Sequence, residues 1–306
     1  MQLFRIMSRK LVYVFNPISG TKRKQEVIKR IESATQKIGL PYEIVSTNSK
    51  GDYAWLKKKV SHEKITDIII IGGDGTVNQI TGSLRNVDVR FGIVPAGSGN
   101  GLAFSAAISK NLNHALKIIF DGHSKKVDAF LINDQYACML SGLGFDGAVA
   151  HKFAMQPSRG LITYVQESLR HFLKASTYKF EININEYSFH ADAYLISIAN
   201  SNQFGNNVTI APKAKLNDGL LDIVVVQKSS KAKLPFNVLK QIRGGNKLQY
   251  FTDNVSKKDV LYFQTEALII KNHNKAPLHV DGEPAKTADE FRIEILKDCF
   301  ELLQPK

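Results

Sequence analysis

Short apolar runs alternate with helix-like stretches over roughly the first 125 residues of the chain. The apolar runs cover 11–17, 42–47, 67–73 and 90–97, and helical patterns occupy 22–38 and 53–60 between them. A strand followed by a helix usually returns to a neighbouring parallel strand. The pattern therefore predicts a parallel sheet covered by helices.

The pattern changes near residue 127, where apolar and polar residues begin to alternate. The segment 180–200 alternates in this way on both sides of Asn185 and Glu186, which predicts two strands joined by a tight turn. We therefore expect a second domain, an antiparallel β sandwich, over 127–288, after a first domain over 1–126. The final segment, 289–306, could complete the first domain, and the pattern leaves that open.

The amino-acid composition narrows the kinds of binding partner that the protein can have, but it does not identify one. The chain has 41 Lys and Arg against 28 Asp and Glu, a net charge of +13, which favours a nucleotide, a nucleic acid or an acidic membrane. Its two cysteines, Cys138 and Cys299, have no metal-site or disulfide spacing, as expected in a reducing cytoplasm. His151 and the other histidines show no metal spacing either. No segment resembles a secretion signal or approaches the ~20 apolar residues of a membrane span.

The segment 227–260 is strongly basic. It carries eight Lys or Arg against Asp253 and Asp259, and a short helix is predicted over 235–242. Its charge fits either a solvated surface loop or a membrane-docking surface, and the sequence alone favours the loop.

The motif with the clearest chemistry is Gly-Gly-Asp-Gly-Thr at 72–76, directly after an apolar strand and before a helix expected to begin near Val77. Glycines let backbone amides approach phosphate groups closely, and a helix N-terminus favours negative charge. Asp74 would repel a bare polyphosphate, so its presence suggests a bridging Mg²⁺. An ordinary glycine-rich turn is the alternative.

Two further turns follow predicted strands. The loop 95–101 is also glycine-rich, and Ser98 and Asn100 can donate hydrogen bonds to nucleotide oxygens. The first strand ends at Asn16 and is followed by a loop at 17–20. Ser19 or Thr21 is better explained as a helix cap than as a phosphate ligand.

Six ordered motifs resemble the family of diacylglycerol kinases, sphingosine and ceramide kinases, and bacterial lipid kinases. They are NPISG, GGDGTVN, PAGSGNGLA, GLGFDGAV, APKAKLNDGLLDI and HVDGEPA, and they span nearly the whole chain. The resemblance implies an N-terminal Rossmann-like α/β domain, of the NAD kinase and diacylglycerol kinase type, and a C-terminal β sandwich. It also implies a lipid kinase that uses ATP and Mg²⁺, with the nucleotide between the domains.

The resemblance also assigns roles to residues. Glu283 would be the general base with Asp281 beside it, and Asp74 would organise the catalytic Mg²⁺. Asp146 would lie near the lipid head or support the metal network. The remaining nucleotide-binding candidates are Asn16, Thr47, Gly72, Gly73, Gly75, Thr76, Asn78, Gly97, Ser98 and Asn100.

A second, structural Mg²⁺ site is implied at 215–220. There the Asp218 carboxylate would join the backbone oxygens of Lys215 and Leu220, a set of hard ligands that suits this cation. A metal-free Asn-Asp-Gly turn explains the same residues. Asp222 would either assist the site or face solvent.

One departure from the family's motifs bears on the identity of the substrate. Many bacterial diacylglycerol kinases have an acidic residue where this chain has Gly101, so the resemblance shifts towards the sphingosine and ceramide kinases. A sphingoid base or ceramide is therefore expected as well as diacylglycerol.

Two other functions remain open, an NAD kinase and a catalytically silent, nucleotide-responsive membrane-binding protein. Nucleic-acid binding is not expected, because no basic stripe is interleaved with stacking aromatic residues. We expect a cytoplasmic protein acting peripherally at the inner face of an anionic membrane. A homodimer is one alternative for its oligomeric state.

Overall fold

The computed structural model describes residues 9–16, 24–47, 51, 53–148, 176–203, 209–230, 233–244, 246–249 and 258–306. The predicted loop at 17–20, His151 and part of the basic segment lie outside these residues. The chain divides into two compact units: unit 1 is Met1–Val127 with Asp298–Lys306, and unit 2 is Asp128–Lys297.

Unit 1 contains the predicted parallel sheet. Its strands are adjacent in the order β4-β3-β1-β2, and all of these pairings are parallel. All six residues of β3 are buried, as expected for a strand covered on both faces. The strands are β1 (Leu11–Phe15), β2 (Tyr42–Ser46), β3 (Asp67–Gly72) and β4 (Arg90–Pro95).

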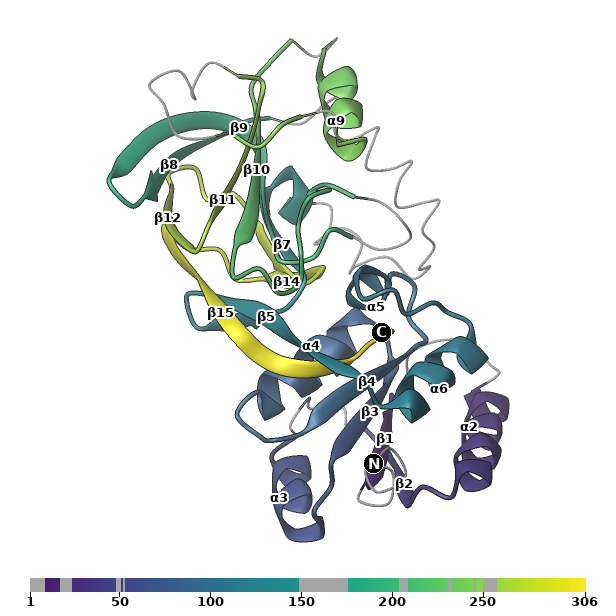
Figure 1. The fold of residues 1–306 in the computed structure, drawn as a ribbon. Coiled ribbons are helices and arrows are strands. Elements are labelled where there is room, and N and C mark those ends of the chain that lie inside the picture. The colour runs from purple at the N-terminus through teal and green to yellow at the C-terminus, as the bar shows by residue number, and fades with distance from the viewer. Residues whose placement is uncertain are drawn as a thin grey trace. The chain divides into compact units, whose positions relative to one another are not determined.

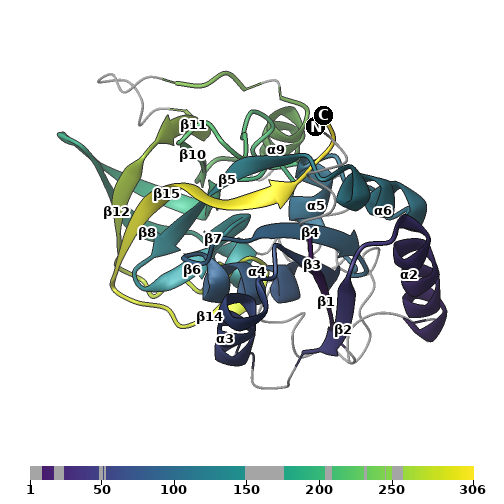
Figure 2. The ribbon, with the colours of Figure 1, turned by 60° about the horizontal axis from the view of Figure 1, so that its bottom comes forward.

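Helices cover both faces of this sheet. Figures 1 and 2 show α3 and α4 on one face and α2 and α6 on the other. The Asn111 side chain caps α6 by accepting a hydrogen bond from the His114 N–H, and α6 stops at Gly122, whose φ of 65° suits glycine. The helices are α2 (Lys24–Ile38), α3 (Ala54–Glu63), α4 (Asp74–Leu84), α5 (Gly101–Ser105) and α6 (Leu112–Asp121).

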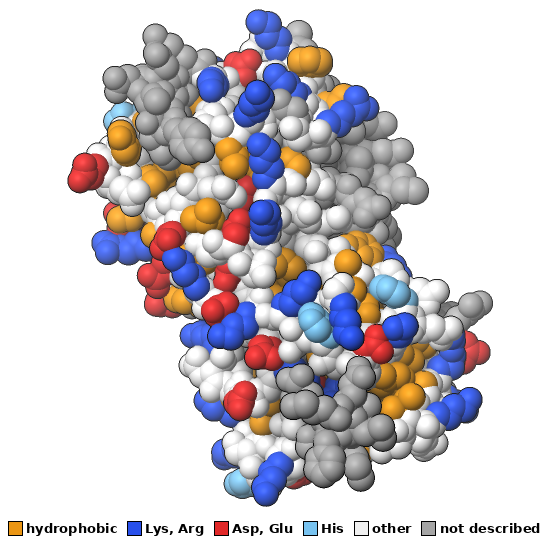
Figure 3. Space-filling model, viewed as in Figure 1, with side chains coloured by type: hydrophobic (Ala, Val, Ile, Leu, Met, Phe, Trp, Pro, Cys, Tyr) orange, Lys and Arg blue, Asp and Glu red, His pale blue; other side chains and the backbone are white. Residues whose placement is uncertain are grey.

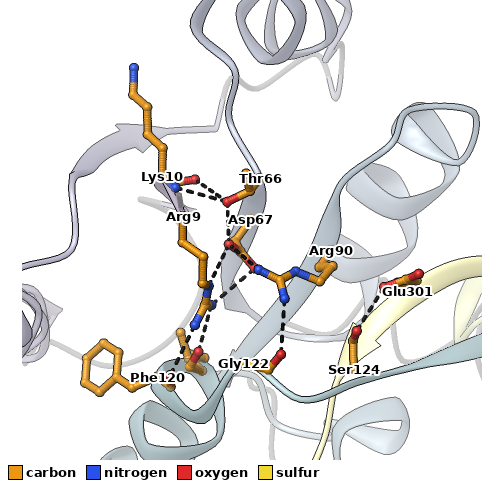
Figure 4. Close-up of polar contacts among 10 residues, drawn as sticks. Arg9, Lys10, Thr66, Asp67, Arg90, Phe120, Gly122, Ser124 and Glu301 are labelled. Atoms are coloured by element: carbon orange, nitrogen blue, oxygen red, sulfur yellow. Dashed lines mark hydrogen bonds and ion pairs between the residues drawn. The ribbon is translucent and has the colours of Figure 1, made fainter. Parts of the chain in front are cut away.

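A buried ion cluster holds the amino ends of two strands. Asp67 is fully buried at the start of β3, with Arg9 Nε 3.0 Å and Arg90 Nη2 2.9 Å from its carboxylate oxygens. Figure 4 shows both guanidinium groups converging on it, and also Ser124 donating to Glu301. Each arginine also donates to backbone carbonyl groups near the end of α6. This cluster ties the sheet to α6 at the end of β3 opposite its glycine motif.

Unit 2 is the predicted antiparallel β structure. The central pairings, β7 with β9, β9 with β8 and β8 with β12, are all antiparallel. The turn at Asn185 and Glu186 joins β8 to β9 as expected, with Asn185 in the left-handed region at φ 51°. One side of the sheet contributes to a buried core that includes Phe130, Phe180 and Phe263. The two-domain fold class is thus confirmed.

The strands of unit 2 are β5 (Ser124–Ile132), which begins in unit 1, β6 (Gln135–Ala137), β7 (Leu140–Gly144), β8 (Tyr178–Ile184), β9 (Tyr187–Ala199), β10 (Leu221–Gln227), β11 (Val260–Thr265), β12 (Ala267–Asn272), β13 (Leu278–Val280), β14 (Glu283–Ala285) and the first part of β15 (Glu290–Leu303).

The last strand, β15, pairs with strands of both units. In β15, residues 290–294 pair with β12, and Glu301 and Leu302 pair with β4. One strand therefore contributes to both units.

The basic segment contains the predicted short helix, α9 (Leu234–Ile242). Among the described residues, no helix has the length and apolar character needed to cross a bilayer.

Candidate active site

The two glycine loops of unit 1 pack directly against each other. A Cβ atom placed on Gly97 would lie 2.4 Å from the Cα of Gly73, and one on Gly73 would lie 2.9 Å from the Cα of Gly97. Any side chain at either position would force the loops apart. The loops follow β3 and β4, which are neighbouring parallel strands, so glycine backbone is concentrated at one edge of the sheet.

Asn100 shapes the second loop. Its Oδ1 accepts from the Gly97 N–H at 2.9 Å, and its Nδ2 donates to the Gly97 carbonyl oxygen at 2.8 Å. The residue is 2% exposed and left-handed at φ 60°, a conformation that asparagine tolerates better than most residues. Sequence reasoning gave Asn100 a nucleotide contact and missed this clamp, and the nucleotide contact stays a prediction.

The first turn of α4 contains Asp74, Gly75 and Thr76. We expected this helix to begin near Val77, but it begins at Asp74, because Gly73 is extended (φ −101°, ψ −174°) and its carbonyl accepts from the Val77 N–H. The first amide groups of a helix have no partner within the helix and form a site for anions. The half-buried Asp74 carboxylate lies in this same turn, where a cation would have to accompany an anionic phosphate.

The ends of β1 and β2 lie at the same edge. The Asn16 side chain donates to Thr76 Oγ1 at 3.3 Å, which joins the end of β1 to the glycine motif. Thr47 is 8% exposed and its N–H donates to the Phe15 carbonyl. Ser98 is exposed, and Asn78 is half-buried in α4. Unit 1 therefore gathers its predicted nucleotide-binding residues where its parallel strands end.

In unit 2, the Asp281 carboxylate is surrounded by backbone donors. It accepts from the N–H groups of Cys138, Met139 and Leu140 at 2.9, 3.0 and 2.9 Å, and Asp281 is 7% exposed. Three such hydrogen bonds fix the position of this carboxylate. The geometry favours a role in holding the turn before Glu283, and direct participation of Asp281 in catalysis stays a prediction.

A buried histidine adjoins the same turn. His279 is 1% exposed, with Nε2 3.1 Å from Asp146 Oδ2, and its Nδ1 accepts from the Gly282 N–H at 3.2 Å. Gly142 makes room for the pair, since a Cβ there would lie 2.4 Å from Asp146 Oδ2. Sequence reasoning proposed Asp146 as a lipid or metal contact and gave no role to His279.

Glu283 is the first residue of β14 and lies exposed immediately after this turn. Within the described residues its carboxylate makes no hydrogen bond or ion pair. It is therefore an accessible carboxylate on a backbone that Asp281 and His279 hold in place.

Carboxylates also gather around the 215–220 turn. Asp128 Oδ2 accepts from the Gly219 N–H at 2.8 Å, and Asp218 Oδ1 accepts from the Leu220 N–H at 3.2 Å. Burial raises the pKa of Asp218, and the nearby Asp128 raises it further. The backbone carbonyl groups of Lys215 and Leu220 belong to the same turn. This oxygen-rich, mutually repelling set fits a hard divalent cation, although its use as a metal site stays a prediction.

Asp222 does not face solvent, which excludes one of its two expected roles. It is fully buried, and it accepts from Tyr262 Oη at 2.5 Å and from Gln264 Nε2 at 2.9 Å. Burial raises its pKa to about 6, and Asp218 contributes in the same direction.

The sheet also brings together Glu181, His190 and His273, whose ligand atoms all lie within 4.8 Å of one another. The spacing of histidines in the sequence gave no sign of this group. Lys271 Nζ lies 2.8 Å from the Glu181 carboxylate, and this hydrogen bond lowers the pKa of Glu181. Glu181 is therefore paired with a lysine on the neighbouring strand β12.

Comparison with known proteins assigns the chain to a family. Residues 10–132 match the diacylglycerol kinase catalytic domain, and residues 141–303 match the YegS C-terminal NAD kinase beta sandwich-like domain. The chain belongs to the YegS-like diacylglycerol kinase family. The family assignment makes the chain a lipid kinase, and it places both glycine loops in the catalytic domain and Glu283 in the β-sandwich domain.

Individual relatives of this lipid kinase are distant but match it over nearly their whole length. The diacylglycerol kinase of Staphylococcus carnosus is 23% identical over 281 residues, which cover 90% of this chain and 89% of the relative. That of Staphylococcus aureus strain MRSA252 is 25% identical over 284 residues, covering 90% and 87%. A crystal structure of a diacylglycerol kinase from Bacillus anthracis superimposes with a TM-score of 0.73 at 21% identity and covers 97% of both chains, which shows the shared fold.

Proposed function

We propose that this lipid kinase transfers the γ-phosphate of Mg-ATP to a hydroxyl group of a diacylglycerol, sphingoid base or ceramide at a membrane surface. The observation that carries the proposal is the contact between Gly73 and Gly97, with Asp74 in the adjoining helical turn. Backbone amides at this edge suit the phosphates of a nucleotide, and the carboxylate suits the accompanying cation.

The phosphate end of ATP would lie against the first turn of α4. The amide groups of Gly75 and Thr76 would donate to phosphate oxygens, with Asn16 orienting the Thr76 hydroxyl. Asp74 would hold Mg²⁺, which when bound neutralises charge on the phosphoryl group. The clamp of Asn100 on Gly97 would keep the second loop in place beside the nucleotide.

Glu283 would act as the general base. Its carboxylate would take the proton from the lipid hydroxyl as the hydroxyl oxygen bonds to the γ-phosphorus. The bond from that phosphorus to the bridging oxygen would break, and ADP would leave. Phosphoryl transfer depends mainly on positioning, so the hydrogen bonds that hold the turn at Asp281 and Gly282 would matter as much as the base itself.

The identity of the lipid rests on two indications that differ. The named relatives are diacylglycerol kinases, which favours diacylglycerol. Gly101, where many bacterial diacylglycerol kinases carry an acidic residue, favours a sphingoid base or ceramide. The site would therefore be tested with both classes.

The proposal includes action at the cytoplasmic face of an anionic membrane, because the substrate would reside in the bilayer. The net charge of +13 would attract the protein to anionic headgroups. No feature of the described residues bears on a homodimer, which stays a prediction.

The decisive experiment follows labelled phosphate from Mg-ATP into lipid. Diacylglycerol, sphingosine, dihydrosphingosine, ceramide and NAD would be offered in parallel to the wild type, Asp74→Asn and Glu283→Gln. The matched controls are Asp88→Asn and Glu290→Gln, which change carboxylates outside the proposed site. A labelled lipid that both site variants lose and both controls keep supports the proposal.

Other outcomes would replace the proposal. Label on NAD alone would indicate an NAD kinase. ATP binding with no transfer to any acceptor would indicate a nucleotide-responsive binding protein. Full lipid kinase activity in Glu283→Gln would show that Glu283 is not the general base.

A further inference from the structure

Helix α9 exposes two large apolar side chains and buries a polar one. Gln241 is fully buried and donates to the Ile210 carbonyl oxygen at 2.9 Å, and Asn237 donates to the Asp259 carboxylate at 2.9 Å. By contrast, Phe236 is 68% exposed and Leu239 is 44% exposed. A helix on a globular surface normally buries its apolar residues and exposes its polar ones.

The exposed pair is unusual within the described residues. Among the described residues, four large hydrophobic side chains are exposed: Ile38, Tyr187, Phe236 and Leu239. Two of these lie three positions apart on α9. Residues three apart share a helix face. Phe236 and Leu239 therefore form one apolar surface, and the hydrogen bonds of Asn237 and Gln241 fix it outward.

Basic residues flank this apolar surface. Lys233, Lys240 and Arg243 are all exposed, and at 100° per residue they fall within the same arc of the helix as Phe236 and Leu239. The segment 227–249 contains six Lys or Arg and no Asp or Glu. Figure 3 shows apolar and basic side chains next to each other over the part of unit 2 where Figure 1 places α9.

We propose that α9 docks on anionic phospholipid bilayers, with Phe236 and Leu239 inserted among the headgroups and Lys233, Lys240 and Arg243 contacting lipid phosphates. Apolar anchors bordered by basic residues are the combination that binds membrane interfaces. The proposal rests on the proposed function, because a kinase whose acceptor lies in the bilayer must reach the bilayer surface. It replaces the solvated loop that the sequence pattern alone favoured.

Charge favours a membrane over a second copy of the chain. Two α9 surfaces brought together would oppose six basic side chains within two chains of net charge +13 each. An anionic bilayer instead satisfies both the apolar and the basic residues.

The test is cosedimentation with vesicles of phosphatidylcholine containing 30% phosphatidylglycerol, at about 0.1 M salt, where the Debye length is about 10 Å. Phe236→Ser with Leu239→Ser is the apolar variant, and Lys233→Gln with Lys240→Gln and Arg243→Gln is the charge variant. Tyr187→Ser is the matched control, because Tyr187 is 55% exposed at the start of β9. We expect at least a tenfold lower partition coefficient for the apolar and charge variants and an unchanged one for the control.

Kinase assays separate this proposal from the proposed function. With the acceptor lipid dispersed in detergent, the apolar variant should keep wild-type activity, because no residue of the nucleotide or base site is altered. Equal vesicle binding by the wild type and the apolar variant would overturn docking through α9 while leaving the kinase intact. If the wild type phosphorylates no lipid and the apolar variant still loses vesicle binding, docking through α9 would be supported and the kinase function would be overturned.

Oligomeric state gives a further check. Sedimentation should show the same mass for the wild type and the apolar variant. A wild-type dimer that Phe236→Ser with Leu239→Ser converts to a monomer would overturn membrane docking in favour of self-association.

Discussion

The imidazole of His279 bridges two parts of unit 2, with Nε2 3.1 Å from Asp146 Oδ2 and Nδ1 accepting the Gly282 N–H at 3.2 Å. The Asp146 carboxylate lies beside Nε2, and the hydrogen bond at Nδ1 lets His279 hold the backbone one residue before Glu283. These contacts make His279 a positioning residue for the proposed base.

Replacing His279 with asparagine should lower kcat by about 10- to 100-fold, because small displacements of a reacting group have effects of this size. Asparagine can still accept from the Gly282 N–H but cannot reach Asp146. The KM for ATP should stay constant, since the proposed nucleotide site belongs to unit 1. Steady-state kinetics with the best lipid acceptor would measure both parameters.

The control for this variant is His190→Asn, which changes an exposed histidine of the same unit. Thermal unfolding would show that both variants are folded. An unchanged kcat in folded His279→Asn would contradict the positioning role, and an equal loss in His190→Asn would make the effect nonspecific.

Replacing Asp281 with asparagine should reduce the free energy of unfolding by about 2 to 4 kcal/mol, because an amide cannot accept all three backbone N–H groups. Urea denaturation would measure this loss, with Asp289→Asn as the exposed control. Asp289 precedes β15 and has no comparable buried donors. A variant with unchanged stability but no activity would instead support a direct chemical role for Asp281.

Much of the fold was predictable because its signals are local. Each strand of unit 1 is a short apolar run, and glycine and asparagine mark many of the turns. The start of α4 was misplaced by three residues because Asp74, Gly75 and Thr76 have poor helix propensity. The extended backbone at Gly73 decides where that helix begins.

The candidate site was only partly predictable, because its supporting contacts are distant in sequence. Asp281 meets the Cys138 amide 143 positions away, and no local pattern indicates that pairing. The exposure of Phe236 and Leu239 on α9 could not be predicted for the same reason, since the buried Gln241 donates to the Ile210 carbonyl, 31 positions away. Family motifs gave residue types at the site, whereas the structure supplied the contacts that hold them.

Magnesium should stabilise the nucleotide-free protein through Asp218. The negative charge of Asp128 helps to raise the pKa of Asp218, and a bound cation would relieve the repulsion between the two carboxylates. At a Mg²⁺ concentration 100 times its Kd, the free energy of unfolding should rise by about 2.7 kcal/mol. Denaturation with and without Mg²⁺ would measure this gain, which Asp218→Asn should abolish and the exposed control Asp134→Asn should retain.

The same site gives a pH dependence. Protons and Mg²⁺ compete for Asp218, so the stabilisation by Mg²⁺ should shrink as the pH falls.

Without Mg²⁺, Asp222 should make the protein more stable as the pH falls, because its folded-state pKa of about 6 lies above its ordinary value of 3.8. Its contribution to stability is fully present below pH 3.8 and is lost as the pH rises through 6. Asp222→Asn should therefore flatten the Mg²⁺-free stability profile between pH 4 and 7, and an unchanged slope would contradict this account.

Asp67 should be the most costly carboxylate to remove from unit 1. Arg9 is only 5% exposed, so Asp67→Ala would leave its guanidinium buried without this partner. Breaking such a buried pair lowers the free energy of unfolding by about 3 to 5 kcal/mol. Asp121→Ala, which breaks an exposed pair with Lys117, should change it by less than ~0.5 kcal/mol. Because Asp67 begins β3 and the glycine motif ends it, the folded fraction of Asp67→Ala should keep the wild-type KM for ATP. Urea denaturation and kinetics at low temperature would measure both quantities, and a raised KM with unchanged stability would place Asp67 in the nucleotide site instead.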